Sequence, residues 1–334
     1  MTDPDALTTV MGYAARLDYV FADFEDEHRE ENVLATVDLV RTHPDPNINS
    51  ARIGNYADYP GAFDPSFPYP WQSDRTDQDI FYRESGLDVA MPHAYPYEYY
   101  ETHTSSYVWG DQIAPNVRSG LFWAPLERMS VALRDLPTDH LAIIWLAGFI
   151  PWDGYEAEPP TQQDREALVK HARLRGAHGY YTLASFIDGY PDDQFRLDML
   201  AQWQSLDWLF DSAQIPCVLN LDTDKTTGLQ WSGMLRGVDA VFLISNLGDD
   251  PAVVDLPDMP GLPNTSPIIE AGTHELLMYT VSAPADITGD GVVDVLDLLE
   301  VLGQWGGSGS ADITGDGVVD VLDLLEVLGA WGPC

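Results

Sequence analysis

A nearly perfect internal repeat is the feature that most constrains this chain. Residues 285–306 read ADITGDGVVDVLDLLEVLGQWG, and residues 311–332 repeat them with one change, Gln304 to Ala330. A duplicated unit of this kind is a supersecondary element that buries its apolar face against its neighbour. The repeat therefore defines a small C-terminal module, residues 285–334.

Oxygen-bearing side chains occur in each repeat at loop positions one, three, five, nine and twelve, with glycine at position six. Calcium takes several oxygen ligands, and this spacing wraps a short loop around one ion, with a valine carbonyl at position seven. The glycines Gly291 and Gly317 permit the sharp turn. We therefore predict two calcium ions. The first has the ligands Asp286, Thr288, Asp290, Val292, Asp294 and Asp297, and the second has Asp312, Thr314, Asp316, Val318, Asp320 and Asp323.

The module carries ten acidic side chains and no basic one. Such a unit repels itself without a counter-ion, so its folding is expected to depend on metal. Apolar residues follow each loop at helical spacing and are expected to pack against their counterparts in the other copy. In the first copy they are Leu296, Leu298, Leu299, Val301, Leu302 and Trp305.

The paired loop-and-helix pattern of residues 285–334 resembles a type I dockerin. That resemblance implies a module that attaches a secreted carbohydrate-active enzyme to a cohesin-like partner. The chain differs from the common pattern in its aspartates at Asp294 and Asp320, and in Val-Leu pairs where cohesin contacts often lie. A calcium-stapled terminal tag without a partner remains the alternative.

Composition excludes some functions. The net charge of −38 excludes nucleic-acid binding through a basic face. No apolar run approaches the ~20 residues that span a membrane. The first residues lack the pattern of a secretion signal, so the chain is either intracellular or begins upstream of Met1. The dockerin resemblance implies an extracellular or cell-surface protein. The two cysteines, Cys217 and Cys334, leave their pairing open.

Residues 1–210 alternate apolar, strand-like runs with helical stretches. This order predicts an α/β fold with parallel strands and crossover helices. Five such units are fewer than the eight of a closed barrel, so we expect a partial (β/α) barrel. The predicted strands are 17–24, 51–56, 87–91, 141–149 and 176–183, and the predicted helices are 32–41, 125–136, 163–173 and 195–210.

Residues 211–281 alternate short apolar runs with turn signals, which predicts a small antiparallel β domain. The expected strands are 217–221, 240–244 and 276–279. A linker at 282–284 separates this domain from the C-terminal module.

Two acids end the first predicted strand. Because strand side chains alternate, Asp23 and Glu25 share one face. Barrel enzymes place their chemistry at this end of a strand. Two neighbouring carboxylates do not both ionise freely, so one pKa rises and that group can donate a proton near neutrality. We expect Glu25 to be the general acid, and Asp23 either to orient it or to stabilise developing charge. The acidic run that follows them allows a different reading, in which both only compensate a helix dipole.

This segment resembles the strand-four motif of family-eighteen glycoside hydrolases, D-x-x-D-x-D-x-E. Asp18, Asp23 and Glu25 match it, and Phe21 replaces an aspartate. The resemblance implies that residues 13–190 hold strands four to eight of a TIM barrel.

Aromatic and polar side chains gather near the ends of the predicted strands. Sugar rings stack on aromatic side chains, while their hydroxyls bind carboxylates and amides. Glu98 and Asp153 are also candidates for a second catalytic carboxylate. The predicted substrate-binding residues are Asn55, Tyr56, His93, Tyr95, Glu98, Trp145, Trp152 and Asp153.

The sequence thus predicts a glycoside hydrolase-like protein that acts on a polysaccharide or oligosaccharide. A non-catalytic carbohydrate-binding or cell-surface protein is the main alternative, and a polysaccharide lyase is a third.

Overall fold

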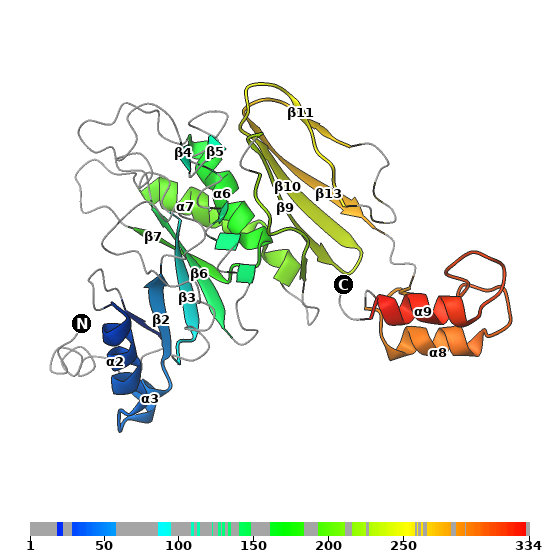
Figure 1. Ribbon diagram of the computed structural model, residues 1–334, viewed down its shortest axis with the longest axis horizontal. Helices are drawn as coiled ribbons and strands as arrows, with labels where there is room; N and C mark the ends of the chain where they lie inside the picture. Colours follow the sequence, from blue (N-terminus) through cyan, green and yellow to red (C-terminus); the bar gives the residue numbers. More distant parts are fainter. Residues whose placement is uncertain are drawn as a thin grey trace.

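The computed structural model contains a parallel sheet, an antiparallel sheet and a C-terminal helix pair (Figure 1). It describes residues 19–22, 29–57, 86–94, 108–109, 112–113, 122, 126–127, 129–130, 133–134, 140–147, 161–183, 193–210, 216–224, 227–257, 259, 262, 266–281, 285–290 and 292–331.

The parallel sheet has five strands, as the sequence predicts. Its order follows the chain: β1 (Tyr19–Ala22), β2 (Arg52–Ala57), β3 (Val89–Ala94), β6 (Leu141–Ala147) and β7 (Gly179–Leu183). Right-handed crossovers that always step in one direction place their helices on one face of a sheet. This is the strand order of a (β/α) barrel, as distinct from a doubly wound sheet.

Four of the helices in this region have defined bounds. They are α2 (Arg29–Arg41), the short α3 (Pro46–Asn49), α6 (Gln162–Leu174) and α7 (Asp193–Gln204), followed by the 3-10 helix η1 (Asp207–Phe210). Helical residues also occur at 126–127, 129–130 and 133–134, within the helix predicted at 125–136, and at 122, before it. A minor hairpin joins β4 (Val108–Trp109) and β5 (Gln112–Ile113).

Helix α6 begins after an N-cap residue, Thr161, that forms a capping box with Asp164. The Thr161 hydroxyl accepts a hydrogen bond from the backbone N–H of Asp164, and the Asp164 carboxylate accepts one from the N–H of Thr161. This reciprocal capping box satisfies two amides that the first turn leaves without helical partners. It also fixes the Asp164 side chain at the start of the helix.

The antiparallel sheet has the order β13–β10–β9–β8. Its strands are β8 (Cys217–Val218), β9 (Leu229–Arg236), β10 (Asp239–Asn246) and β13 (Thr273–Thr280), and a separate pair joins β11 (Ala252–Val253) to β12 (Ile268–Ile269). The predicted antiparallel pairing is confirmed. Cys217 is disulfide-bonded; the only other cysteine in the sequence, Cys334, lies outside the described residues.

Strand β9 is absent from the expected strands because Ser232 and Gly233 interrupt its apolar run. The fold explains the glycine. A Cβ at Gly233 would lie 2.9 Å from Cδ1 of Phe242 on the neighbouring strand, so only glycine leaves room for that ring.

One apolar core joins the two sheets through the helices between them. Ile144 of β6, Leu168 and Ala172 of α6, and Val241 and Leu243 of β10 belong to the same buried cluster. The antiparallel sheet therefore packs on the helix layer of the parallel sheet.

The C-terminal module contains two equal helices, α8 (Val295–Gly303) and α9 (Val321–Gly329), which lie side by side. Its buried core consists of small residues, three from each repeat: Ala285, Val293, Val301, Ala311, Val319 and Val327. Val319 links the copies, because its backbone exchanges hydrogen bonds with Gly306 and Gly307.

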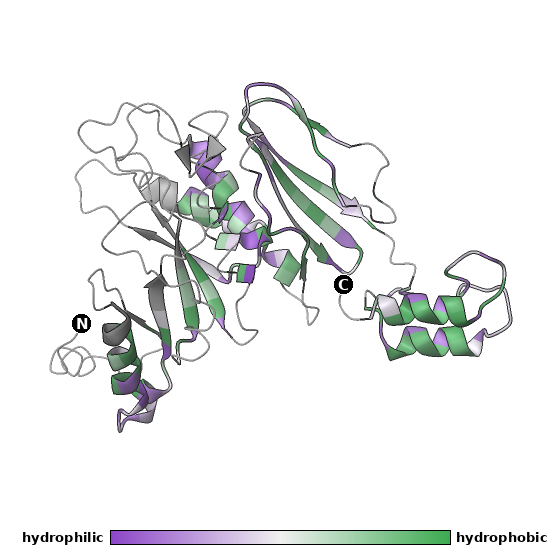
Figure 2. Cartoon of the chain, in the orientation of Figure 1, coloured by the Kyte–Doolittle hydropathy of each residue, from purple (hydrophilic) through white to green (hydrophobic). Residues whose placement is uncertain are grey.

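The expectation that all the large apolar residues of these helices pack together is wrong. Leu296, Leu299, Leu302 and Trp305 are about half exposed, and only Val301 and Leu298 turn toward the other repeat. A pair of helices offers each helix one contact face, so the remaining leucines lie on the outer surface. Figure 2 shows this as apolar colour over much of both helices. No helix among the described residues is long and apolar enough to cross a membrane.

Candidate functional site

The predicted catalytic pair follows strand β1, which ends at Ala22. Asp23 and Glu25 lie outside the described residues, so their geometry stays a prediction. The same holds for four of the predicted substrate-binding residues, which are Tyr95, Glu98, Trp152 and Asp153.

The other four predicted substrate-binding residues lie on three neighbouring strands. His93 of β3 is paired in register with Trp145 of β6, and Trp145 is paired with Tyr181 of β7. Asn55 and Tyr56 stand near the carboxyl end of β2, paired with Ala90 and Met91. The fold therefore brings these backbone positions toward one edge of the sheet. Tyr181 was not among the predicted substrate-binding residues, although it is an aromatic residue of the predicted strand 176–183.

The predicted metal ligands of the first acidic loop lie in the described part of the C-terminal module. Oδ1 of Asp286 accepts hydrogen bonds from the N–H groups of Gly289 and Asp290 at 2.8 and 3.1 Å. Oδ1 of Asp290 accepts one from Val292 at 3.0 Å. These bonds fold the loop and occupy one oxygen of each carboxylate.

The second loop leaves one oxygen without a hydrogen-bond partner. Oδ2 of Asp312 accepts a hydrogen bond from the N–H of Gly317 at 2.9 Å. Oδ1 of the same carboxylate is buried and has no hydrogen-bond partner. A buried anionic oxygen without a partner is costly, and a bound cation would compensate it.

The turns of both loops depend on glycine. Gly289 and Gly315, at loop position four, have φ values of +71° and +72°, and Gly317 at position six has +96°. These values favour glycine because they are strained for a residue with a Cβ. The role predicted for Gly317 is confirmed, whereas Gly291 lies outside the described residues. The two glycines at position four also require a positive φ, which the spacing of oxygen ligands in the sequence does not predict.

The last ligand position of each loop is buried within the first turn of the following helix. Asp297 and Asp323 are fully buried. Burial alone would raise the pKa of Asp297, but hydrogen bonds from the N–H groups of Thr288 and Asp294 and from the Thr288 hydroxyl lower it. The pKa of Asp323 is lowered by the backbone N–H groups of Thr314 and Asp320. Both carboxylates are thus held in the charged form that binds cations.

Asp294 and Asp320, the predicted ligands at loop position nine, are helix N-caps. The carboxylate of each accepts a hydrogen bond from the N–H two residues later.

Within the described residues, no group of three or more His, Cys, Asp or Glu side chains is arranged to hold a metal ion. The oxygen donors fit calcium in type and spacing, but the side chains are turned toward backbone amides rather than toward a common centre.

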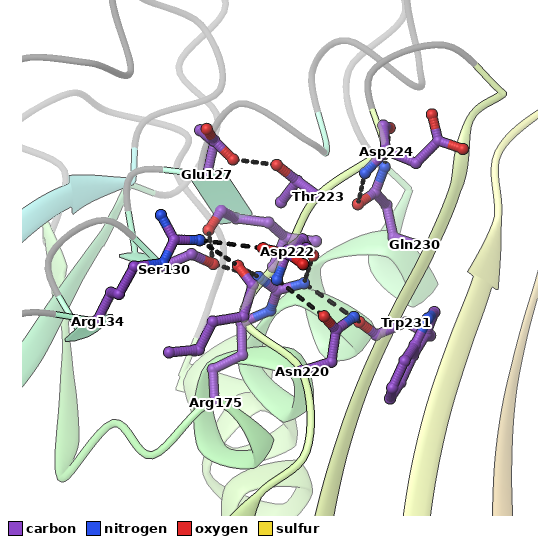
Figure 3. Close-up of polar contacts among 12 residues, drawn as sticks. Glu127, Ser130, Arg134, Arg175, Asn220, Asp222, Thr223, Asp224, Gln230 and Trp231 are labelled. Carbon is purple, nitrogen blue, oxygen red and sulfur yellow. Dashed lines mark hydrogen bonds and ion pairs between the residues drawn. The ribbon is translucent and has the colours of Figure 1, made fainter. Parts of the chain in front are cut away.

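A buried polar cluster between α6 and the antiparallel sheet was not foreseen. Its largest member is Arg175, which is 1% exposed. Its guanidinium donates to the hydroxyls of Ser232 and Ser130 and to the carbonyls of Leu221, Asp222 and Trp231 (Figure 3). Burial lowers the pKa of Arg175 to about 10, and the charges of Glu127 and Asp222 oppose that shift. The guanidinium therefore remains a cation at neutral pH.

No protein-family model matches the sequence, and no curated protein matches it. Some solved structures are similar in arrangement. A conserved exported protein from Bacteroides fragilis has 11% identity and a TM-score of 0.39, covering 83% of this chain and 67% of its own. AmyP in complex with maltose has 12% identity and a TM-score of 0.37, covering 80% of this chain and 65% of its own. This chain thus spans about two thirds of each of those proteins.

A third structure is a cyclic α-maltosyl-(1→6)-maltose hydrolase from Arthrobacter globiformis. It has 12% identity and a TM-score of 0.29, covering 82% of this chain and 88% of its own. Because all three scores are low, the function of this chain is inferred from its own residues.

Proposed function

We propose that residues 285–334 bind two calcium ions, one in each acidic loop. The observation that carries the proposal is Oδ1 of Asp312, a buried carboxylate oxygen without a hydrogen-bond partner at the first ligand position. In the first loop the ligands are Asp286, Thr288, Asp290, Val292, Asp294 and Asp297, and in the second they are the residues 26 positions later. The bound ions would neutralise part of the acidic charge and fasten the loops to their helices.

Calorimetric titration of the metal-stripped full chain tests this proposal. We expect two calcium ions per chain and much weaker binding of magnesium, which favours small octahedral sites that keep several waters. In Asp312→Asn the number of ions bound should fall to one. Unchanged binding by that variant, or no heat with the parent chain, would refute a calcium site at this loop.

We propose further that the parallel-sheet region is a glycoside hydrolase-like unit. Its strand order is that of a (β/α) barrel, and His93, Trp145 and Tyr181 stand in register across three strands. Glu25 would protonate the leaving oxygen of a polysaccharide, and Asp23 would hold Glu25 in place. The remaining predicted residues at the strand ends would bind the sugar.

Hydrolysis of a panel of polysaccharides by the purified chain tests the enzymatic part. Glu25→Gln should abolish product formation without loss of folding. Glu30→Gln makes the same change in the acidic run that follows and should retain activity. If the parent chain binds a polysaccharide but forms no product, the non-catalytic carbohydrate-binding alternative is the better description.

The exposed leucines of α8 and α9 support a role in attachment. Equivalent residues of the two helices, Leu299 and Leu325, are each 56% exposed. Apolar faces of this kind bind a partner surface when helices dock into grooves. We propose a cohesin-like partner, and an extracellular location, which the disulfide at Cys217 supports because disulfides persist in oxidising compartments. Binding to a cohesin module should be lost in EDTA, and binding that persists there would contradict calcium-dependent attachment.

A further inference from the structure

Six buried or nearly buried polar side chains connect α6 with the antiparallel sheet. Helix α6 contributes Asp164 and His171, and Arg175 is its C-cap. The strands β9, β10 and β13 contribute Ser232, Ser245 and His274. Five contacts join them in a row. These are Arg175 Nε to Ser232 Oγ at 2.7 Å, Ser232 Oγ to His171 Nδ1 at 2.7 Å, His171 Nε2 to Ser245 Oγ at 2.8 Å, Ser245 Oγ to His274 Nδ1 at 2.7 Å, and His274 Nε2 to Asp164 Oδ1 at 2.9 Å.

When Asp164 is ionised and both histidine rings are neutral, the two ends of this row determine the direction of every hydrogen bond. An ionised Asp164 only accepts, so His274 donates from Nε2, and its Nδ1 accepts from the Ser245 hydroxyl when the ring is neutral. Ser245 then accepts from Nε2 of His171, which leaves Nδ1 of His171 as the acceptor for Ser232. Ser232 in turn accepts from Arg175, which only donates. In this arrangement each proton and each acceptor along the row has a partner.

We propose that these six residues form one hydrogen-bond chain of fixed direction, from Arg175 to Asp164, that latches α6 to the antiparallel sheet and loosens in acid. In this direction each histidine carries its proton on Nε2. Phe122 keeps the rings in place, because it lies edge-on to His171 and stacks on His274 with centroid distances of 5.4 and 5.6 Å. We call the six residues the α6 latch.

Acid acts on the latch at His171. A second proton on this ring would sit on Nδ1 and face the Ser232 hydroxyl, which already points its own proton there. The ring is fully buried. Its charged or titratable neighbours are Arg175, Lys170 and His274, and Asp164 lies beyond His274. From β9 and β10 it meets the neutral hydroxyls of Ser232 and Ser245. Burial first, and then the neighbouring Arg175, His274 and Lys170, hold the pKa of His171 well below 6.5.

The lowered pKa of His171 determines the sign of the pH effect. Below about pH 6.5 an unfolded chain takes up a proton at His171 that the folded chain does not. Stability from this group is therefore complete above pH 6.5 and decreases as the pH falls toward the folded pKa. The unfolding equilibrium constant should rise by up to about tenfold per pH unit in that window.

Nitrogen-15 NMR of histidine-labelled full chain tests the latch without any substitution. At neutral pH two histidine rings should show the Nε2–H tautomer, and one of them should remain neutral at pH 6. An Nδ1–H tautomer at either ring, or titration of every histidine near pH 6.5, would overturn the proposal.

Hydrogen exchange tests the acid response. Corrected for intrinsic rates, protection of α6 and of β9 and β10 should decrease together between pH 7.5 and 5.5. In His171→Gln, which keeps a donor and an acceptor but does not titrate, this dependence should be lost. His43 lies between α2 and α3, away from the interface of α6 with the antiparallel sheet. The control variant His43→Gln should therefore behave like the parent chain. Protection of α6 that is independent of pH in the parent chain would show that the latch is structural only.

Discussion

Oδ1 of Asp323 accepts two hydrogen bonds from Thr314, one from its backbone N–H at 2.9 Å and one from its hydroxyl at 3.1 Å. Asp297 and Thr288 form the same pair in the first repeat, at 2.9 and 3.0 Å. In each repeat, therefore, the third loop position is bonded to the twelfth, and these bonds join the loop to its helix.

Asp323→Asn should remove one of the two proposed calcium ions. An amide retains the oxygen that Thr314 needs but lacks the charge, and its NH₂ group cannot accept the hydrogen bond from Asp320. The change in calcium stoichiometry is measured by calorimetric titration. Glu326→Gln neutralises a carboxylate on the exposed part of the same helix and should still bind two ions. Equal binding by both variants would argue against Asp323 as a ligand.

Gly317→Ala should destabilise the C-terminal module by roughly 1–2 kcal/mol, because φ is +96° and a Cβ is strained in the left-handed region. No atom lies within 4 Å of the added Cβ, so the cost arises from the backbone alone. Gly329→Ala, at a helical position that is equally open, should stabilise the module by about 0.5–1 kcal/mol. Equilibrium unfolding of the two variants should therefore shift in opposite directions.

Arg175→Met should cost about 3 kcal/mol or more, because it removes a buried cation that donates to the buried Ser232 hydroxyl and to the partly buried carbonyls of Leu221 and Asp222. Arg134→Met is the matched control. Arg134 forms an ion pair with Asp222 at 3.2 Å, but the two side chains are 48% and 92% exposed. Its loss should cost about 0–1 kcal/mol. Urea unfolding at neutral pH compares them, and a similar small cost for both would contradict the structural role of Arg175.

The oxidised chain should contain no free thiol, because Cys217 is disulfide-bonded and the sequence has two cysteines. A thiol reagent added in denaturant should label nothing before reduction and two sites afterwards. A covalent dimer on a non-reducing gel would instead indicate a bond between chains.

Local patterns predicted the parts of the fold that depend on neighbours in sequence. The five parallel strands follow from apolar runs within each strand. The acidic loops were predicted as calcium sites from their spacing, and the backbone hydrogen bonds that their carboxylates accept were not part of that prediction. Asp294 and Asp320 were predicted only as calcium ligands; their role as N-caps of α8 and α9 was missed, although a capping residue just before an apolar run is a local signal.

The α6 latch could not be predicted in this way. His171 meets Ser232 and Ser245, which are 61 and 74 residues away in sequence, and Asp164 meets His274 across 110 residues. In the sequence these residues resemble ordinary polar positions of an amphipathic helix and of a half-buried strand. Helical periodicity shows which side of α6 they share, but it does not show what packs against that side. Similarly, the half exposure of Leu296 depends on how many helices surround it, which the repeat does not specify.

The apolar cluster that Ile144 shares with Val241 and Leu243 has a consequence for how the chain can be divided. Removing everything after Phe210 would uncover the outer surface of α6 and α7 and leave Arg175 and Asp164 without their companions. A truncated protein of that kind should aggregate. A cut just after Val281 would break no part of this cluster. The C-terminal module is therefore separable from the rest of the chain, whereas the two sheets depend on each other.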